Sequence, residues 1–461
     1  MTVDRRGLLT GGLTLGGAGL TALAGARAAG SQAVDGPATA DMRRAITSAE
    51  AGLIPDAAED QTKRLQAAID IAAERRVALV MAPGRYRAAG LKLKPQTRLI
   101  GDGGTATLAL SSNGPLLLAE AADRLHLHHI ALDGGMLEND GVAGALVVLK
   151  GCRNVSISHL DLKAAAGHGI ALEACSGRIH LSRISVVGDA AIFALDSKGL
   201  EITDNTISDC GNNGIQVWRS ADGEDASIVS RNRIEQIAAR SGGSGENGNG
   251  INVFRAGSVL VEGNRIADCA YSAVRGNAAS NIQILANSCQ RIGEVALYAE
   301  FGFQGALIAG NLVDTAAAGI SVTNFNVGGR LAVVQGNLIR NLKRREHEPV
   351  DKRGEGIAVE ADASVTGNTV ENAPTAGIVI GWGRYMRNVV VTGNLVRDAR
   401  VGIAITSASD AGACFVTGNM ISGATDGAIR AMDEGRLHGP DLAREPVATS
   451  GRVVVERNMA V

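Results

Sequence analysis

Apolar and polar residues alternate along most of this chain in short runs that repeat from Ile202 onward. Each copy has a brief apolar alternation, an Asn, a second alternation and, after a gap, a run of the form Gly-Ile-x-Val, with clear examples beginning at Gly214, Gly250 and Gly319. Period-two alternation is typical of strands, and no copy holds the roughly ten residues of helical periodicity that a helix needs. The pattern therefore predicts short strands separated by turns, and it excludes helical solenoids.

From Asn205 to Asn419 the Asn returns at intervals of 23 to 32 residues. Self-similarity at such a period predicts a solenoid in which every coil packs only against its neighbours. Asn tolerates left-handed backbone angles, and its amide can bond to the Asn of the next coil. We therefore predict an all-β, single-stranded right-handed parallel β-helix with a stack of Asn side chains at one corner. The predicted stack contains Asn205, Asn232, Asn264, Asn311, Asn337, Asn368, Asn394 and Asn419, and we count Asn287 and Asn458 as further copies of the repeat.

The repeat frame continues upstream without the Asn, where Ile130, Leu160 and Ile184 take its place. Solenoids need capped ends, because the terminal coils would otherwise expose apolar core to solvent. Residues 60–76 are predicted to form an amphipathic capping helix at the N-terminal end. The period breaks again over residues 433–450, where we expect the other cap. The apolar face of the predicted helix consists of Leu65, Ala68, Ile69 and Ala72.

The first residues are expected to be a targeting segment rather than part of the fold. Arg5 and Arg6 precede a short, Gly-rich apolar stretch, and a small-x-small cleavage site follows at residues 26–28. This pattern is typical of a twin-arginine signal, so we expect the mature protein in the periplasm or outside the cell, with no stable membrane span. The predicted domains are a signal peptide (1–28), a linker (29–58), an N-terminal cap with the first coils (59–124) and a β-helix with a C-terminal cap (125–461).

Charge and cysteine usage narrow the range of partners. The formal net charge is -2 and the sequence pI is about 6.5. This balance gives little of the counterion release that drives nucleic-acid binding, so nucleic acid is not an expected partner. Cys210 and Cys269 occupy the same place two repeats apart, roughly 10 Å at one strand spacing per coil, which is beyond the reach of an unstrained bridge. We read the six cysteines as small buried side chains.

A family resemblance rests on the N-terminal segment. Asp60-Gln61-Thr62, Leu65-Gln66-Ala67-Ala68-Ile69 and Pro83-Gly84-Arg85-Tyr86 resemble the entry to β-helices of the pectate lyase and polygalacturonase superfamily. With the signal and the Asn repeats, the chain is similar to a family of twin-arginine-exported β-helix repeat proteins without an assigned activity. The resemblance implies that a substrate would lie along one outer sheet, which here is the sheet that carries Gly-Ile-x-Val.

Aromatic residues are concentrated just after that strand. The chain has 2 Trp, 4 Tyr and 6 Phe, and most of them follow this strand together with Arg and Asn. Flat rings beside hydrogen-bonding groups suit a sugar, and Arg in adjacent coils suits an acidic polysaccharide or another glycan of the cell envelope. Two alternatives stay open: the rings only cover the strand, and the Arg side chains form a solvated stripe. The predicted substrate-binding residues are Trp218, Arg219, Phe254, Arg255, Arg275, Asn277, Tyr298, Glu300 and Trp382.

The candidates for catalysis are four residues that precede this strand in their coils: His168, Asp189, Asn213 and Glu246. Polygalacturonases carry catalytic carboxylates and a Gly-His-Gly at this place, and here only the Gly-His-Gly around His168 and a single Asp are kept. Two-carboxylate hydrolysis would need Glu246 as the second group. A lyase or epimerase needs only a base and cations that stabilise the enolate. A non-catalytic glycan-binding scaffold stays an equal alternative.

A metal or cofactor site is the remaining alternative. His126, His128 and His129 lie close together, and His159 aligns with His129 one coil later. Two His on adjacent coils could share a metal, but no set of ligands has a tight spacing. We therefore predict no metal residues, and the sequence names no cofactor.

Overall fold

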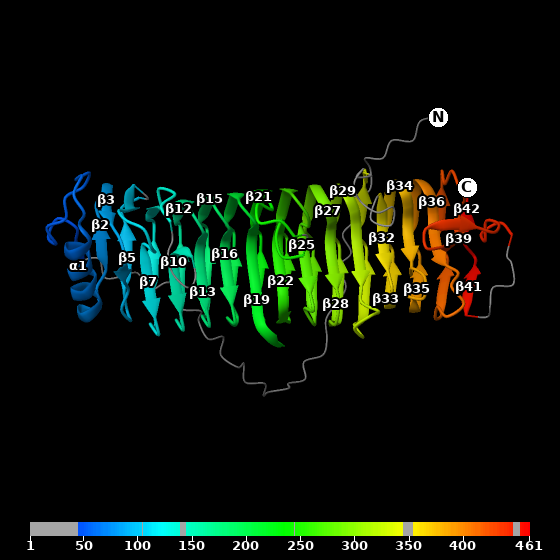
Figure 1. Cartoon of the computed structure of the whole chain (residues 1–461), viewed down its shortest axis with the longest axis horizontal. Coiled ribbons are helices and arrows are strands. Elements are labelled where there is room, and N and C mark those ends of the chain that lie inside the picture. The colour runs from blue at the N-terminus through cyan, green and yellow to red at the C-terminus, as the bar shows by residue number, and fades with distance from the viewer. Residues whose placement is uncertain (1–44, 104, 139–143, 244, 344–353, 446–451) are drawn as a thin grey trace, which may run out of the picture. The chain divides into compact units, whose positions relative to one another are not determined.

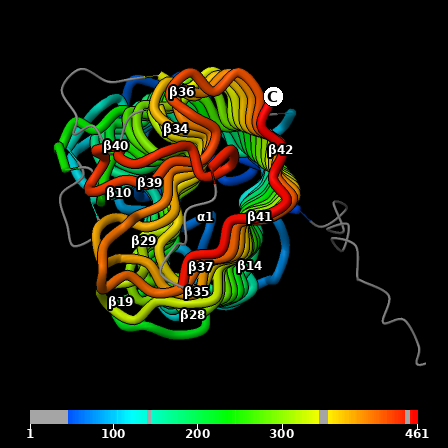
Figure 2. The backbone as a smooth tube through the Cα atoms, turned by 90° about the vertical axis from the view of Figure 1, so that its right-hand side faces the viewer, coloured from blue at the N-terminus to red at the C-terminus, as the bar shows by residue number. Residues whose placement is uncertain are grey.

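The computed structural model describes residues 45–103, 105–138, 144–243, 245–343, 354–445 and 452–461. The predicted signal peptide lies outside the described residues, as does most of the predicted linker. Residues 41–461 form one compact unit. This unit is a right-handed parallel β-solenoid of about 13 turns, which confirms the predicted fold class (Figure 1). Viewed along the axis, the coils stack closely on one another (Figure 2).

The first face of the solenoid is a 16-stranded parallel sheet. Each coil contributes one short strand to it, paired in register with the equivalent strand of the next coil. The strands are β1 (Ile46–Thr47), β2 (Leu79–Met81), β5 (Arg98–Gly101), β8 (His126–His128), β11 (Val155–Ser158), β14 (Gly177–His180), β17 (Glu201–Thr203), β20 (Ile228–Ser230), β23 (Leu260–Glu262), β26 (Ile282–Leu285), β28 (Gln304–Ala309), β30 (Arg330–Gln335), β33 (Ala361–Thr366), β35 (Arg387–Thr392), β37 (Cys414–Thr417) and β41 (Val453–Glu456).

The second face follows the first across the Asn corner. It consists of β3 (Gly84–Ala88), β6 (Ala106–Leu110), β9 (Ala131–Asp133), β12 (Asp161–Ala165), β15 (Arg183–Val187), β18 (Thr206–Cys210), β21 (Arg233–Ile237), β24 (Arg265–Cys269), β31 (Leu338–Arg340), β38 (Met420–Ser422) and β42 (Met459–Ala460). Four longer strands run round the next corner and contribute to the second and third faces: β27 (Ser288–Glu300), β29 (Leu312–Thr323), β34 (Thr369–Ile380) and β36 (Leu395–Thr406).

The third face carries the Gly-Ile-x-Val runs. Its own strands are β4 (Leu91–Lys92), β7 (Leu117–Glu120), β10 (Ala145–Lys150), β13 (His168–Glu173), β16 (Ala190–Leu195), β19 (Asn213–Glu224), β22 (Asn249–Gly257), β25 (Val274–Asn277), β32 (Glu355–Val359) and β39 (Ile429–Asp433). Inward positions of these strands stack as columns of aliphatic side chains, such as Ile215 on Ile251 on Val274, all buried. Burying such columns against neighbouring coils is the main stabilising contribution of a solenoid.

The predicted Asn stack is confirmed, and every amide in it bonds along the axis. Asn232 Oδ1 accepts from the backbone N–H and from Nδ2 of Asn205, each at 3.0 Å. Asn205 Nδ2 also donates to the Ile179 carbonyl at 2.9 Å. The same set of contacts recurs as far as Asn458. A buried polar side chain at each corner is thereby fully bonded, so the corner carries no desolvation penalty for an unpaired amide.

One upstream assignment was wrong. The place of the Asn before Asn205 is held by Ser182, not by Ile184, because the Ser182 backbone N–H donates to Asn205 Oδ1 at 3.0 Å. Ser182 Oγ accepts in turn from the Leu160 N–H at 3.1 Å. Ile184 lies two residues later, where it stacks on Ile207 in the core. A hydroxyl group thus continues the ladder for one coil on the N-terminal side of Asn205.

The N-terminal end is closed by α1 (Thr62–Arg75), which confirms the predicted capping helix. Leu65, Ala68, Ile69 and Ala72 are buried as expected. The predicted linker is partly folded: β1 pairs with β2, and Leu53 is buried at 4% exposure. This segment covers the edge of the first coil, which an unpaired strand would leave open.

The described part of the segment over 433–450 packs on the end of the solenoid, because Leu442 is buried in the main core and its backbone N–H donates to the Ile429 carbonyl at 2.9 Å. The same part continues β39 into an antiparallel hairpin with β40 (Arg436–His438), and β41 and β42 then add a further coil. The six cysteines are free and buried, as predicted. Cys210 and Cys269 are separated by Ile237 in one inward column, which explains why they cannot bond. No helix in the described ranges is long and apolar enough to cross a membrane.

Candidate functional face

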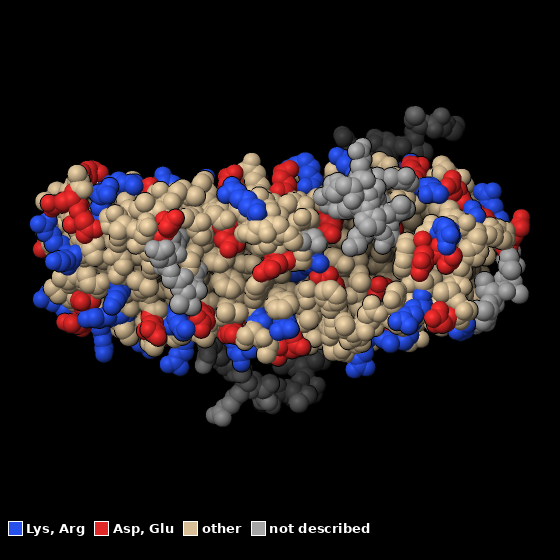
Figure 3. Space-filling view, in the orientation of Figure 1, with Lys and Arg blue, Asp and Glu red and all other residues tan. Residues whose placement is uncertain are grey.

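The third face presents three outward columns of side chains, because its strands pair without a shift along most of their length. The leading column contains His168, Asn213, Asn249, Val295, Ala318 and Glu355. The middle column contains Phe193, Gln216, Asn252, Arg275, Tyr298, Ser321 and Ala358. The trailing column contains Leu195, Trp218, Phe254, Asn277, Glu300 and Thr323. In the space-filling view of this face, Lys and Arg gather mainly along its two long margins (Figure 3).

The segment between β21 and β22 covers the middle of this face. Asn213 Nδ2 donates to the Glu246 carbonyl at 3.0 Å. Asn252 Nδ2 donates to the same carbonyl and to that of Gly245, each at 3.1 Å. Asn213 is 0% exposed, whereas the side chain of Glu246 is exposed. The predicted catalytic role of Asn213 is therefore corrected: its side-chain amide holds the covering segment in place. The segment also divides the face into an N-terminal and a C-terminal half.

His168 and Asp189 meet in the N-terminal half. His168 Nε2 lies 3.5 Å from Asp189 Oδ2, and Nδ1 accepts from the Ala190 backbone N–H at 3.2 Å. The ring stacks on Phe193 with 4.9 Å between ring centroids. Burial lowers the pKa of His168, while Asp189 works against this shift. The imidazole is therefore neutral near pH 7, with Nε2–H directed at the carboxylate.

A broad hollow of about 660 Å³ lies beside this pair. Leu118, Val148, Ala171 and Phe193 give it an apolar floor. Lys150 and Glu173 stand at its edge and form an ion pair at 3.1 Å. The predicted catalytic pair thus borders a surface that a flat, apolar ligand face would fit.

Three rings follow one another from this hollow toward the centre of the face. Phe193 and Trp218 have ring centroids 5.7 Å apart, as do Trp218 and Phe254. Arg255 lies over Phe254 at 4.8 Å from its centroid and donates to the Ser220 carbonyl at 3.0 Å. Trp218 and Phe254 are partly exposed, as predicted for rings on an outer face.

The expected row of three Arg side chains is not formed. Arg275 belongs to the middle column, beside Asn252, and it is 7% exposed. Its Nε and Nη2 donate to Glu300 Oε1 and Oε2 at 2.7 and 2.9 Å, and its guanidinium lies over the Tyr298 ring at 4.8 Å. Asn277 donates to the same carboxylate at 2.9 Å. These four residues, which we predicted to bind substrate, hold one another in a buried network.

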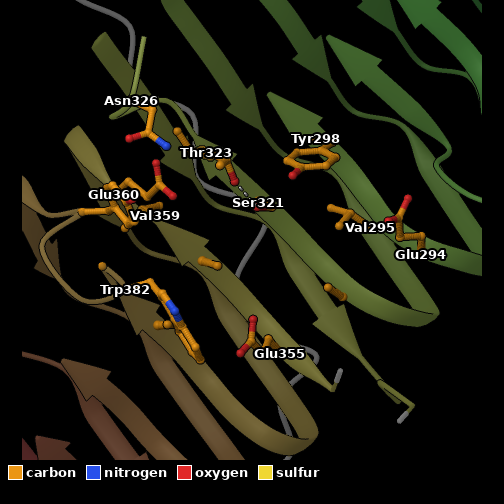
Figure 4. Close-up of a pocket in the computed structure, with 16 residues that line it drawn as sticks. Glu294, Val295, Tyr298, Ser321, Thr323, Asn326, Glu355, Val359, Glu360 and Trp382 are labelled. Carbon is orange, nitrogen blue, oxygen red and sulfur yellow. Dashed lines mark hydrogen bonds between the residues drawn. The ribbon is translucent and has the colours of Figure 1, made fainter. Parts of the chain in front are cut away.

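A cavity of about 270 Å³ opens in the C-terminal half (Figure 4). Three carboxylates line it: Glu294 from β27, Glu355 at the start of β32 and Glu360 just after β32. Trp382 follows β34 and stands on the opposite side from Glu294, as the close-up shows. Tyr298, Ser321, Thr323 and Tyr385 supply hydroxyl groups to the lining. We call this site the glutamate pocket.

The ionisable groups that line the glutamate pocket are mainly acidic. Burial raises the pKa of Glu360, although its Oε2 accepts from the backbone N–H groups of Asn324 and Phe325, each at 2.9 Å. Burial also raises the pKa of Tyr298 to about 12. Arg275 Nη1 lies 3.7 Å from Glu294 Oε2 at the edge of the site. Among the described residues that line the pocket there is no Lys or Arg.

Trp382 is held in place by the β39–β40 hairpin. Its ring packs with Leu437 against a small cluster of buried residues that includes Met432. A Cβ at Gly435 would lie 2.8 Å from the ring, so the hairpin backbone approaches the indole where only Gly fits. The hairpin that interrupts the repeat therefore supports the Trp382 wall of the pocket.

The sequence pattern did not single out Glu294 or Glu355. Glu355 shares the leading column with His168, so its repeat position was a usable signal. Glu294 precedes Val295 as Asp189 precedes Ala190, which places it in the equivalent turn. Glu360 and Tyr385 also follow strands of the third face, but nothing in the repeat indicates that they line one pocket with Glu355.

Comparison with known proteins supports the fold. A family model for "Right handed beta helix region" matches residues 222–387, and one for "Periplasmic copper-binding protein (NosD)" matches residues 134–291. No curated protein matches the chain significantly. The class that the coils and the matched region define is thus the right-handed parallel β-helix.

Solved structures similar to the chain include the gene product 12 N-terminal fragment of bacteriophage phi29. It is 15% identical with a TM-score of 0.63, and the match covers 86% of this chain and 73% of the fragment. The pre-mature form of that protein is 16% identical with a TM-score of 0.57, and the match covers 86% of this chain and 58% of the longer protein. The A-module of a mannuronan C-5 epimerase from Azotobacter vinelandii is 16% identical with a TM-score of 0.44, over 89% of this chain and 100% of the module. At such identities the likeness shows the fold alone.

Proposed function

We propose that the protein binds an extended glycan along the third face, with the glutamate pocket as the principal subsite. The observation that carries this proposal is the combination, in one open cavity, of the Trp382 ring with hydroxyl and carboxylate groups. A sugar presents apolar ring faces and hydroxylated edges, so an indole wall beside acceptors matches both. The face continues past the pocket on a regular strand spacing of roughly 4.8 Å, which gives an elongated chain further points of contact.

The charge of the site changes the expected ligand. The acidic polysaccharide expected from the sequence depended on Arg219, Arg255 and Arg275, and Arg275 is buried against Glu300. Glu294 is paired with Arg275, so the repulsion of a uronate at short range is expected from Glu360, whose partners Asn324 and Phe325 offer only backbone N–H groups. We therefore propose a neutral glycan or one that carries free amino groups.

We also propose export through the twin-arginine route to the periplasm or beyond. The Arg5-Arg6 pair, the short apolar stretch and the small-x-small site support this route. A family named for a periplasmic protein, whose model matches residues 134–291, supports the compartment. Among the described residues, no three His, Cys, Asp or Glu side chains are grouped to hold a metal.

Proton-transfer chemistry at the pair of His168 and Asp189 is a second candidate function. The observation that favours it is the contact between His168 Nε2 and Asp189 Oδ2 beside the apolar hollow. Both nitrogens of His168 are engaged, Nδ1 with the Ala190 N–H and Nε2–H with Asp189, so the Asp189 carboxylate is the group of the pair that can take up a proton, as a lyase or epimerase requires, and His168 orients it. The pair would need a substrate whose acidic C–H lies over Phe193. Asp189→Asn should then abolish product formation from an oligosaccharide that still binds, and His168→Ala should reduce it.

The binding proposal is tested by calorimetry with three sets of oligosaccharides: neutral glucans, glucosamine oligomers and oligouronates. Glu360→Gln and Tyr385→Ala should each weaken binding by about tenfold or more, the effect of losing about 1.4 kcal/mol of binding free energy. Phe415→Ala is the matched control, since Phe415 is an exposed ring (37%) on the first face and should leave affinity unchanged. Binding that persists in both pocket variants, or no binding by the native chain, would overturn the proposal.

A further inference from the structure

The second face changes character along the solenoid at one outward column. We call this column the stripe. Its early positions are charged or polar: Asp161, Arg183, Thr206, Arg233, Arg265 and Ser288. Its later positions are mostly apolar: Leu312, Leu338, Thr369, Leu395, Met420 and Met459. Leu338, Met420 and Met459 are 37%, 45% and 60% exposed. Because the same repeat position is polar in one half and apolar in the other, the fold does not require the apolar side chains there.

Beside the stripe, two residues further along each strand, runs a column of alternating charge. Asp314, Arg340, Glu371 and Arg397 succeed one another in adjacent coils. Neighbours pair within the chain, with Arg340 Nη2 at 2.9 Å from Asp314 Oδ2 and Arg397 Nη1 at 3.5 Å from Glu371 Oε1. Both Arg side chains remain about half exposed, so they can also reach a partner.

The order of charges in this column is complementary to the same column read in the opposite direction. When a second copy is placed face to face by a two-fold axis that lies in the interface, parallel to the strands and between the coils of Arg340 and Glu371, the order of the coils is reversed in the facing column. Arg340 then faces Glu371 of the second copy, and Asp314 faces Arg397. All four charges find an opposite charge, and the apolar stripe faces itself. An axis centred on one coil would instead place Glu371 against Glu371.

A parallel arrangement is not favoured. A two-fold axis along the solenoid would leave every coil opposite itself and would exchange the two columns. Leu312 would then face Asp314, and Leu338 would face Arg340, so that charges would be desolvated against apolar side chains. The pattern on this face thus selects both the direction and the register of a second copy.

We propose that the protein self-associates through the stripe as an antiparallel two-fold dimer. Two columns over six coils cover roughly 25 Å by 14 Å, which is about 350 Å² on each copy. A standard stable interface takes about 800 Å² from each partner. The dimer is therefore weak and reversible, with a dissociation constant in the micromolar range or above. It leaves the third face of both copies free, so two glycan-binding faces would be linked.

The test is sedimentation of the full chain from about 1 µM to about 1 mM. The native chain should move from monomer to dimer over this range. Leu338→Glu should remain monomeric, whereas Thr206→Glu, the same change in the polar half of the same column, should associate as the native chain does. Concentration-independent monomer for the native chain, or association by Leu338→Glu, would overturn the proposal.

A mixing experiment tests the register directly. Arg340→Glu alone would place two carboxylates together across the interface, and Glu371→Arg alone would place two cations together. Each variant should lose association. In a mixture of the two, the substituted residues face opposite charges, so a heterodimer should form. Ion pairing within one chain cannot produce this recovery, and its absence would contradict the antiparallel register.

Discussion

Arg275 and Glu300 form a bidentate ion pair in which both residues are almost fully buried, at 7% and 1% exposure. Removing one partner of such a pair leaves the other charge in a low-dielectric site. We expect Arg275→Ala to lower the free energy of unfolding by about 3 to 5 kcal/mol. Urea unfolding followed by circular dichroism measures this change.

An exposed ion pair one coil away supplies the control for this substitution. Arg291 Nη2 lies 2.6 Å from Asp268 Oδ2, but both side chains are 40% exposed or more. Arg291→Ala should cost far less stability than Arg275→Ala, because an exposed pair is hydrated and screened. If the two variants lose equal stability, the buried network around Glu300 does not contribute the stability that its burial implies.

The Asn ladder should be most sensitive in its middle. Asn311→Ala removes the acceptor of the Asn287 N–H and Nδ2, and the donor to the Ile284 carbonyl. Unpaired buried groups cost about 1 to 3 kcal/mol each, so we expect a loss of about 3 kcal/mol or more in thermal or urea unfolding. Asn311→Ser should recover part of it, because Ser182 already performs this task.

Asn458→Ala is the matched comparison. Asn458 also accepts from its neighbour Asn419, at 3.0 Å, but it is partly exposed in the last coil. Water can replace the lost amide there, so the cost should be below about 1 kcal/mol. Equal losses at the two positions would show that burial does not set the strength of the ladder.

The fold could be predicted from the sequence because each coil repeats the same physical requirements. Alternation marks the strands, and the Asn marks the corner where a buried amide must bond along the axis. Ser182 was missed for a related reason: a hydroxyl can meet the same requirement, while the apolar Ile184 beside it resembles a core residue. The ladder is visible in a sequence only where one residue type repeats.

The candidate site was harder to predict because it depends on departures from the repeat. Arg275 was placed after its strand, yet Val274 aligns with Ile251, so Arg275 lies inside the strand beside Asn252. Asn213 is buried only because the segment before β22 folds over it. Where an insertion lies relative to a sheet is decided by contacts across coils, and no period in the sequence records them.

Histidines on the first face should make the protein sensitive to acid. The pKa of His128 is lowered to about 4 by burial and by repulsion from neighbouring His126, His129, His180 and His159. An unfolded chain takes up this proton near pH 6.5, so the unfolded state binds more protons between pH 6.5 and about 4. The free energy of unfolding should therefore fall as the pH drops through this window, by roughly 1 to 2 kcal/mol after allowing for partial exposure.

His128→Gln tests this effect, since an amide can keep the contact with Ser158 without titrating. The urea midpoint of this variant should decline less than that of the native chain between about pH 7 and about pH 4.5. His438→Gln, at an exposed His of the C-terminal hairpin, should follow the native chain. Identical pH profiles for all three proteins would exclude His128 as the cause.

Glu360 should make ligand binding in the glutamate pocket depend on pH. Burial raises the pKa of this carboxyl above 4.5, so it takes up a proton while exposed carboxyls remain ionised. A protonated Glu360 offers no charge to an ammonium group. The affinity for a glucosamine oligomer should therefore fall as the pH drops from neutral toward the raised pKa of Glu360, approaching about tenfold per pH unit once the carboxyl is mostly protonated. Calorimetry across this range measures the slope. Glu360→Gln should bind the oligomer weakly with little slope, and a neutral glucan should show little slope with the native chain. A pH dependence that is the same in Glu360→Gln and the native chain would assign the titration to another group and remove the argument for an amino-bearing ligand at this position.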